Sequence, residues 1–278
     1  MRERFVAVRG LTLCLCEWGP EDGQTVVLLH GWLEHGGFWW RVAEQLANAG
    51  LRVIAPDARG HGRSGHVGVG GYYHFPDYLV DLDGLVTEPV HLLGHSMGGT
   101  VACMFAAARP EKVLSLTLSE GLGPPSEPMP QAVTRIRSHL DHMQRDWRSG
   151  TALTLDQAAD RMRRSWPALD AEEARALAAR QLSDGHWSFD GLHRSKAPIA
   201  FHLDRHLEQL RRIEAPVGLA LGKGSWYAGI DRLQERIECI RPRFVEHLDG
   251  GHALHLEAHT ALAALSLKVQ ACSEPDTR

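Results

Sequence analysis

The stretch Gly94-His95-Ser96-Met97-Gly98-Gly99 governs how the rest of this chain is interpreted. It follows the apolar run Val90 to Leu93 and precedes a helix-like run, Thr100 to Arg109. This order predicts a strand, a sharp turn and a helix with Ser96 at the tip of the turn, which is the geometry of a nucleophile elbow. Side chains in place of the flanking glycines would crowd the strand or the helix. We expect Ser96 to stand above a sheet, with the Met97 amide directed at a substrate oxygen.

Two further segments supply candidate partners for this serine. The buried strand expected over Val26 to Leu29 is followed at once by His30-Gly31-Trp32, and the Trp32 amide is placed to be a second oxyanion donor. Near the end of the chain a strand over Phe244 to Leu248 leads into a glycine-rich loop that ends at His252. A histidine after the last strand can act as the general base, and His252 comes last in the chain order serine, acid, histidine.

With these segments in view, the sequence resembles the α/β-hydrolase superfamily over nearly its whole length. The resemblance includes Asp57-Ala58-Arg59-Gly60-His61-Gly62-Arg63-Ser64, which is similar to the D-x-R-G-x-G-x-S loop of the family, and Gly251-His252 with His255 and Glu257, which is similar to its terminal G-H-x-x-H-x-E pattern. The spacing of segments after residue 110 is most similar to that of the serine hydrolase-like proteins. The resemblance implies a nucleophile–histidine–acid triad and a helical cap.

The triad acid departs from the usual family pattern. After the strand Val217 to Leu221, the position that commonly holds the acid is Ser225, which cannot stabilise an imidazolium as a carboxylate does. Some members carry the acid after the preceding strand, and here Glu120 follows the strand Val113 to Leu118. Active-site groups gather at the carboxyl ends of such strands. We therefore expect Glu120 to be the acid, with Asp231 and Asp249 as the alternatives.

The order of the remaining elements predicts a mostly parallel sheet with helices on both faces and an inserted helical cap. A hairpin turning at Arg9-Gly10 comes first, and helices are expected over Phe38 to Ala49 and Pro76 to Val86. Residues 124–205 contain no convincing strand and three helix-like stretches, near Gln131 to Gln144, Leu155 to Arg164 and Ala171 to Leu182. We therefore predict a core domain of residues 1–123 and 206–278 and a cap of residues 124–205.

Composition excludes several other classes of protein. The net charge of −4 is spread along 278 residues, which argues against a nucleic-acid partner. The basic run Arg161-Met162-Arg163-Arg164 is interpreted as a solvated helix face. No apolar stretch is long enough for a membrane span or a secretory signal, so we expect a cytoplasmic protein without a membrane partner. Five irregularly spaced cysteines do not form a disulfide framework, and the pairs His202/His206 and His255/His259 lack a third ligand, so no metal and no cofactor are expected.

We predict a serine hydrolase that cleaves a small or medium ester, thioester or amide through an acyl-enzyme at Ser96, with a carboxylic ester as the favoured substrate. Haloalkane dehalogenase and epoxide hydrolase chemistry are disfavoured because they use a carboxylate nucleophile. Two alternatives remain open: a non-enzymatic ligand-binding protein on a hydrolase fold, and a cofactor-free C–C hydrolase or oxygenase with the same triad. The substrate and the oligomeric state are also open. Candidate residues for the wall of a small-molecule pocket are His30, Phe38, Trp39, Trp147 and Trp187.

Overall fold

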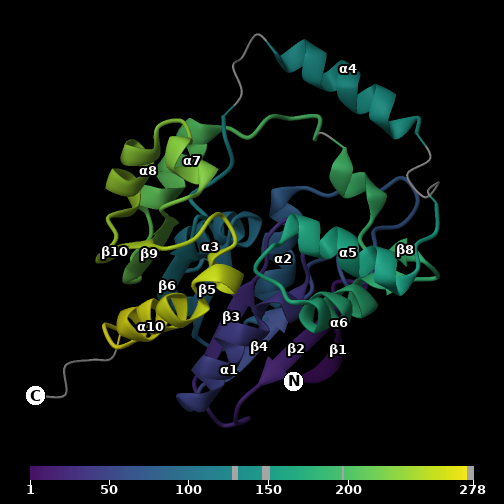
Figure 1. Cartoon of the computed structure of the whole chain (residues 1–278). Helices are drawn as coiled ribbons and strands as arrows, with labels where there is room; N and C mark the ends of the chain where they lie inside the picture. Colours follow the sequence, from purple (N-terminus) through teal and green to yellow (C-terminus); the bar gives the residue numbers. More distant parts are fainter. Residues whose placement is uncertain (127–130, 146–150, 196, 274–278) are drawn as a thin grey trace, which may run out of the picture.

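An eight-stranded sheet forms the centre of the molecule (Figure 1). The structure, a computed structural model, describes residues 1–126, 131–145, 151–195 and 197–273. The strands lie in the order β1-β2-β4-β3-β5-β6-β9-β10; β2 runs antiparallel to both of its neighbours, and the six strands from β4 to β10 are parallel. Their bounds are Arg2–Val8 (β1), Leu11–Trp18 (β2), Thr25–Leu29 (β3), Arg52–Pro56 (β4), Val90–His95 (β5), Val113–Ser119 (β6), Val217–Gly222 (β9) and Phe244–Leu248 (β10).

Helices cover both faces of this sheet, as the sequence predicts. On one face, α1 and α10 pack against the strands, and α2, α3, α7 and α8 cover the other. The bounds are Trp40–Asn48 (α1), Phe75–Leu85 (α2), Met97–Ala108 (α3), Leu203–Arg211 (α7), Leu233–Ile240 (α8), Leu254–Glu257 (α9) and His259–Gln270 (α10). None of the helices in the described ranges is long and apolar enough to cross a lipid bilayer.

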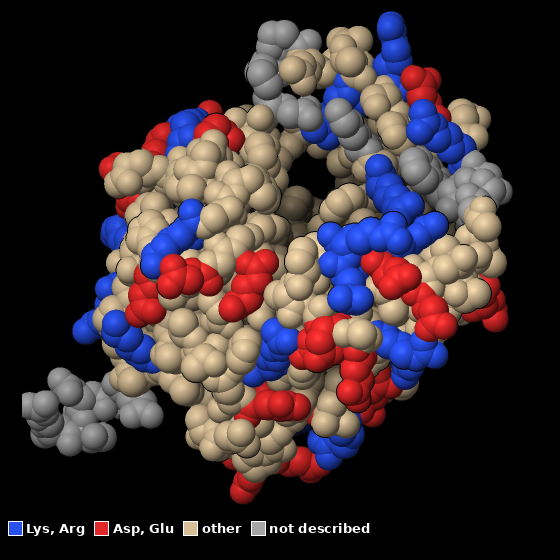
Figure 2. Space-filling view, viewed as in Figure 1, with Lys and Arg blue, Asp and Glu red and all other residues tan. Residues whose placement is uncertain are grey.

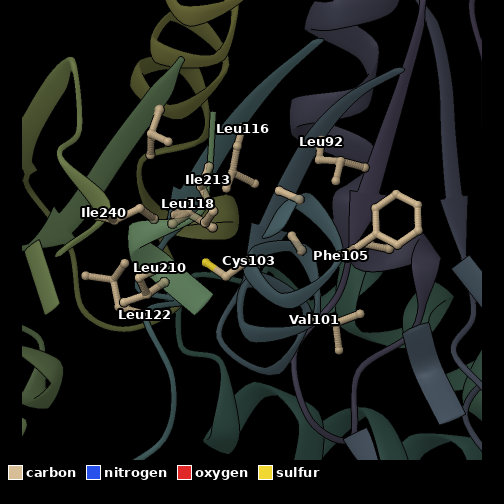
Figure 3. Close-up of a cluster of buried hydrophobic side chains, with 14 of the residues drawn as sticks. Leu92, Val101, Cys103, Phe105, Leu116, Leu118, Leu122, Leu210, Ile213 and Ile240 are labelled. Carbon is tan, nitrogen blue, oxygen red and sulfur yellow. The ribbon is translucent and has the colours of Figure 1, made fainter. Parts of the chain in front are cut away.

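The central strands are apolar on both faces because both faces are covered. Successive side chains of a strand point to opposite sides. In β3, Val26 and Leu28 therefore join the cluster under α1 and α10, whereas Val27 and Leu29 join the cluster under α2 and α3. Figure 3 shows part of the second cluster, in which side chains of β5, β6 and α3 meet, including Leu92, Leu118 and Cys103. The uninterrupted apolar runs in the sequence follow from this double burial.

The three helices predicted in the cap are present as α4 (Ala132–Met143), α5 (Leu155–Ser165) and α6 (Ala171–Gln181). A third hydrophobic cluster joins α5 and α6 to Phe38 and Leu256 of the core. The expectation that the cap contains no strand is wrong, because β7 (Leu182–Ser183) and β8 (His186–Trp187) form a short hairpin. Its turn, Asp184-Gly185, has positive φ at both residues (50° and 76°), and aspartate–glycine favours such a turn.

The division into core and cap stays our proposal, with one adjustment at its second boundary. Helix α7 begins at Leu203, inside the predicted cap. Leu203, Leu207 and Leu210 pack in the same cluster as α3. The chain has therefore returned to the core three residues before residue 206.

Candidate active site

The turn between β5 and α3 holds Ser96 in a strained conformation. Its φ is 51°, a value that few residues other than glycine adopt. The flanking glycines are sterically required: a Cβ on Gly94 would lie 2.6 Å from Gly99 Cα, and a Cβ on Gly98 would lie 2.2 Å from the Leu29 carbonyl oxygen. Close approach of α3 to two strands thus fixes the turn, and the half-buried Ser96 side chain is left at its tip.

His252 bridges the serine and a buried carboxylate. It lies in the loop between β10 and α9, and its Nε2 is 3.0 Å from Ser96 Oγ. Its Nδ1 is 2.6 Å from Oε2 of Glu120. Because a carboxylate only accepts hydrogen bonds, Nδ1 carries the proton and Nε2 is free to accept one from the serine. This is the proton arrangement that a serine nucleophile needs.

Glu120 is held by two further donors from the neighbouring segment. It follows β6, is fully buried and has a positive φ of 50°. Its Oε1 accepts a hydrogen bond from the Gly222 amide at 2.7 Å, and its Oε2 accepts one from the Ser225 hydroxyl at 2.6 Å. Ser225, which stands where the family pattern commonly has the acid, therefore supports a carboxylate that comes from the adjacent strand.

The two alternative acids are engaged elsewhere. Asp231 accepts hydrogen bonds from the amide and hydroxyl of Ser126 at 3.0 and 2.7 Å. Asp249 pairs with Lys223 at 2.6 Å, and its side chain is 90% exposed. Across the described ranges, Glu120 is the carboxylate that the structure brings to His252.

The two predicted oxyanion donors, Trp32 and Met97, belong to segments that pack against each other at the elbow. Met97 begins α3, and the close packing of Gly98 on the Leu29 and His30 carbonyls sets the loop that carries Trp32 beside the elbow. Neither the Trp32 nor the Met97 backbone amide has an acceptor within the described part of the chain. Both amides are thus available to a ligand oxygen.

A buried ion pair behind His252 is a feature that the sequence reasoning missed. His95 Nδ1 lies 3.3 Å from Oε2 of Glu34, and its Nε2 lies 2.9 Å from the backbone oxygen of His252. Both ring nitrogens face acceptors, so the imidazolium is the form that satisfies both contacts. Burial opposes this charge, but the Glu34 carboxylate outweighs it and raises the pKa of His95. The same Oε2 accepts the Gly31 amide at 2.8 Å, which links the oxyanion loop to the loop of His252.

His255 completes a group with metal-ligand spacing. Its nearest nitrogen, a carboxylate oxygen of Glu34 and a nitrogen of His95 lie within 4.8 Å of one another. Burial lowers the pKa of His255 to about 3, so its ring is neutral. Glu34 and His95 already bond to each other, to the Gly31 amide and to the His252 carbonyl, and a metal would have to break these contacts. We therefore interpret the group as structural, and the expectation of no metal remains a prediction.

The predicted pocket residues have mixed outcomes. Phe38 and Trp39 are fully buried in hydrophobic clusters, Phe38 against the cap and Trp39 against the sheet, so these two are corrected to packing residues. His30 is buried too, and it lines a cavity of about 40 Å³ beside Met97, which is too small for a substrate. Trp187 is half-buried and lines a larger groove on the cap. Trp147 lies outside the described residues.

Two aromatic rings flank the catalytic histidine candidate. The rings of Trp226 and Tyr227 lie 4.9 and 5.9 Å from that of His252, measured between centroids. Tyr227 is buried and donates a hydrogen bond to the Gly123 carbonyl at 3.0 Å, whereas Trp226 is 57% exposed. Trp226 is therefore a candidate residue for the wall of a substrate pocket beside His252, and the sequence did not single it out.

Comparisons with known proteins agree with this architecture. Residues 24–259 match the alpha/beta hydrolase fold family. The chain is 30% identical over 279 residues to a serine hydrolase-like protein of Danio rerio, in an alignment that covers 93% of this chain and 85% of that protein. This similarity confirms the resemblance found in the sequence.

Solved structures are similar over nearly the whole chain. The thioesterase domain from the curacin biosynthetic pathway superposes with a TM-score of 0.89 at 33% identity and covers 96% of this chain and 99% of that one. A hypothetical protein from Pseudomonas aeruginosa PAO1 superposes with a TM-score of 0.84 at 30% identity and covers 98% and 99%.

Proposed function

We propose that this chain, which belongs to the α/β-hydrolase family, is a serine hydrolase of acyl substrates. The substrate class that we favour is a thioester. The observation that carries the proposal is the unbroken series of contacts from Ser96 Oγ through both nitrogens of His252 to Glu120, at 3.0 and 2.6 Å. Similarity to a thioesterase domain supports the choice of a thioester among the ester, thioester and amide substrates that such a site can cleave.

The first half of the reaction transfers the acyl group to the protein. Ser96 Oγ attacks the carbonyl carbon while His252 Nε2 takes the hydroxyl proton. The carbonyl electron pair moves to oxygen, and the amides of Trp32 and Met97 stabilise the oxyanion. When the intermediate collapses, the carbon–sulfur bond breaks and the leaving thiolate takes the proton from His252. An ester of Ser96 and a free thiol result.

The second half of the reaction regenerates the serine. A water molecule gives a proton to His252 Nε2 and attacks the ester carbon. Collapse returns this proton to Ser96 Oγ and releases the carboxylic acid. In both halves the buried Glu120 stabilises the imidazolium of His252 and keeps its Nε2 directed at Ser96.

Labelling with a fluorophosphonate probe tests the activated serine. We expect a single adduct on Ser96, and none in Ser96→Ala. Ser119→Ala is the matched control, because Ser119 is a fully buried serine at the end of the adjacent strand and its loss should leave labelling unchanged. Absence of labelling in a folded wild-type sample would favour the non-enzymatic binding protein instead. A series of p-nitrophenyl esters and acyl thioesters of graded chain length then measures the size of the acyl pocket.

A further inference from the structure

A groove on the cap gathers basic and aromatic side chains from three segments of the chain. Its volume is about 330 Å³, within the range of small-molecule sites. On the face drawn in Figure 2, Lys and Arg side chains gather beside a hollow, in the region where Figure 1 places α5. The groove is lined by three arginines and three aromatic residues, namely Arg161, Arg164, Arg194, Trp166, Trp187 and Phe189.

The three arginines of this groove are not neutralised by the protein. Within the described part of the chain, none of them lies within ion-pair distance of a carboxylate. Other arginines of the cap and its border are paired: Arg180 contacts Asp57 at 2.8 Å, and Arg175 contacts a carboxylate of α5. Three like charges around one depression repel each other, and an anion bound between them would relieve this repulsion.

The rings supply flat apolar surface next to these charges. Trp187 and Phe189 are stacked, with 14° between their planes and 6.3 Å between their centroids. The guanidinium of Arg194 lies 4.9 Å from the centroid of Phe189. Aromatic and guanidinium planes of this kind bind nucleobases by stacking, while arginines pair with phosphates.

The groove adjoins the loop that carries the proposed oxyanion donor. Leu33, which follows Trp32, lines it, and the side chain of Gln181 donates a hydrogen bond to the Leu33 carbonyl at 2.6 Å. On the same loop, the indole of Trp32 donates to the His193 carbonyl at 3.0 Å, one residue before Arg194. A ligand in the groove would therefore lie beside the site rather than on a remote face.

We propose that this groove binds the nucleotide part of a thioester's leaving group, with the base against the rings and the phosphates on the arginines. The proposal rests on the thioester form of the proposed function, because a thiol leaving group can carry a nucleoside phosphate. A concave site of this size accommodates one base and its phosphates. A protein partner would instead need a broader surface, about 800 Å² on each side of a standard interface.

Matched substrates test this assignment. One acyl group is presented on coenzyme A, which carries an adenine nucleotide, and on N-acetylcysteamine, which carries none. In the double variant Arg161→Ala/Arg164→Ala we expect KM for the coenzyme A thioester to rise roughly tenfold, since exposed ion pairs are weak individually. The KM for the N-acetylcysteamine thioester and kcat for both should stay within about twofold. Arg163→Ala is the control, because Arg163 is exposed on the same helix but does not line the groove.

Inhibition by adenosine 3′,5′-bisphosphate and by inorganic phosphate separates a nucleotide site from a simple anion site. We expect the bisphosphate to inhibit coenzyme A thioester hydrolysis competitively and more strongly than phosphate. Trp187→Ala should weaken inhibition by the bisphosphate about fivefold or more and leave inhibition by phosphate unchanged. Equal inhibition by both anions, or equal KM changes in the Arg163 control, would overturn the proposal.

Failure of this proposal is distinguishable from failure of the proposed function. If Ser96 reacts with the fluorophosphonate probe but the groove variants treat both thioesters alike, the hydrolase stands and the nucleotide site does not. If Ser96 is unreactive, calorimetric titration of adenosine 3′,5′-bisphosphate into wild type and into the Arg161→Ala/Arg164→Ala variant still measures nucleotide binding to the groove. Equal or absent binding in that titration contradicts the nucleotide site.

Discussion

Replacing Glu120 by glutamine keeps the shape of the side chain and changes the protons that it presents. In the wild-type protein the two carboxylate oxygens of Glu120 accept three hydrogen bonds, from the Gly222 amide, the Ser225 hydroxyl and His252 Nδ1. A glutamine offers one oxygen and one NH2 group. If the oxygen faces Gly222, the NH2 group faces Nδ1, and His252 must take the tautomer whose Nε2 carries the proton. That nitrogen can then no longer accept the proton of Ser96.

The opposite orientation of the amide is also unfavourable. It points the NH2 group at the Gly222 amide, two donors face each other in a buried site, and the negative charge that stabilises the imidazolium is still lost. An asparagine at the acid position of a serine protease triad lowers kcat by about 10⁴ for the same tautomeric reason. We expect Glu120→Gln to lower kcat by roughly 10³- to 10⁴-fold, which is about 4 to 5 kcal/mol of transition-state stabilisation.

The assay is steady-state hydrolysis of a p-nitrophenyl ester, with the rate of fluorophosphonate labelling as a second readout. Asp249→Asn is the matched control, because its carboxylate is exposed and pairs with Lys223. Ser225→Ala removes one of the three hydrogen bonds and should cost about tenfold or less. A Glu120→Gln protein that folds normally and keeps more than a tenth of the wild-type kcat would refute the assignment of the acid.

Three further predictions concern the serine, the buried ion pair and the buried histidines. Ser96→Ala should lower turnover by about 10⁴-fold or more while the free energy of unfolding, measured in urea, changes by less than about 0.5 kcal/mol, since the half-buried hydroxyl fills no core space. Glu34→Gln should destabilise the fold by about 3 kcal/mol at pH 6, because it leaves the His95 imidazolium buried without its carboxylate. Because the pKa of His95 is raised in the folded state, the ion pair contributes its full stability below the unfolded pKa of about 6.5 and loses it as pH rises through the folded pKa. The urea midpoints of wild type and Glu34→Gln should therefore converge as pH rises above about 6.5, and a difference that stays constant with pH would contradict the pairing. Burial lowers the pKa of His91 and His206 to about 4 and that of His255 to about 3, so below pH 6.5 the unfolded chain binds more protons than the folded one. The free energy of unfolding should therefore fall by on the order of 1–2 kcal/mol per histidine between pH 7 and pH 5. Urea midpoints of wild type and of the His91→Gln, His206→Gln and His255→Gln variants measure this fall.

The sequence predicts the features of this molecule that depend on local geometry. Gly94 and Gly98 flank Ser96 because backbone atoms approach the turn too closely for any Cβ, and such a constraint leaves a readable pattern of residue types. The position of Glu120 could likewise be inferred. An apolar run defines the end of β6, and Ser225 occupies the position after β9 at which the family pattern commonly has the acid.

Features that depend on packing between distant segments are not readable in this way. Phe38 and Trp39 are adjacent aromatic residues, yet Phe38 packs on Trp166 of the cap and Trp39 packs in the core of the sheet. Nothing in their local sequence distinguishes these two environments. Glu34 and His95 are separated by 61 positions and pair only because β3 and β5 are neighbours in the sheet. The effect of the Glu34 carboxylate on the pKa of His95 therefore exists only in the folded chain.

Detection of the acyl-enzyme tests the central claim most directly. An acyl thioester is mixed with the protein, the reaction is stopped with acid within the first turnover, and peptides are analysed by mass spectrometry. We predict that the peptide containing Ser96 gains the mass of the acyl group, and that Ser96→Ala gains none and releases no thiol above background. Thiol release by the Ser96→Ala protein at the wild-type rate, or an acyl group found on another residue instead of Ser96, would contradict the account.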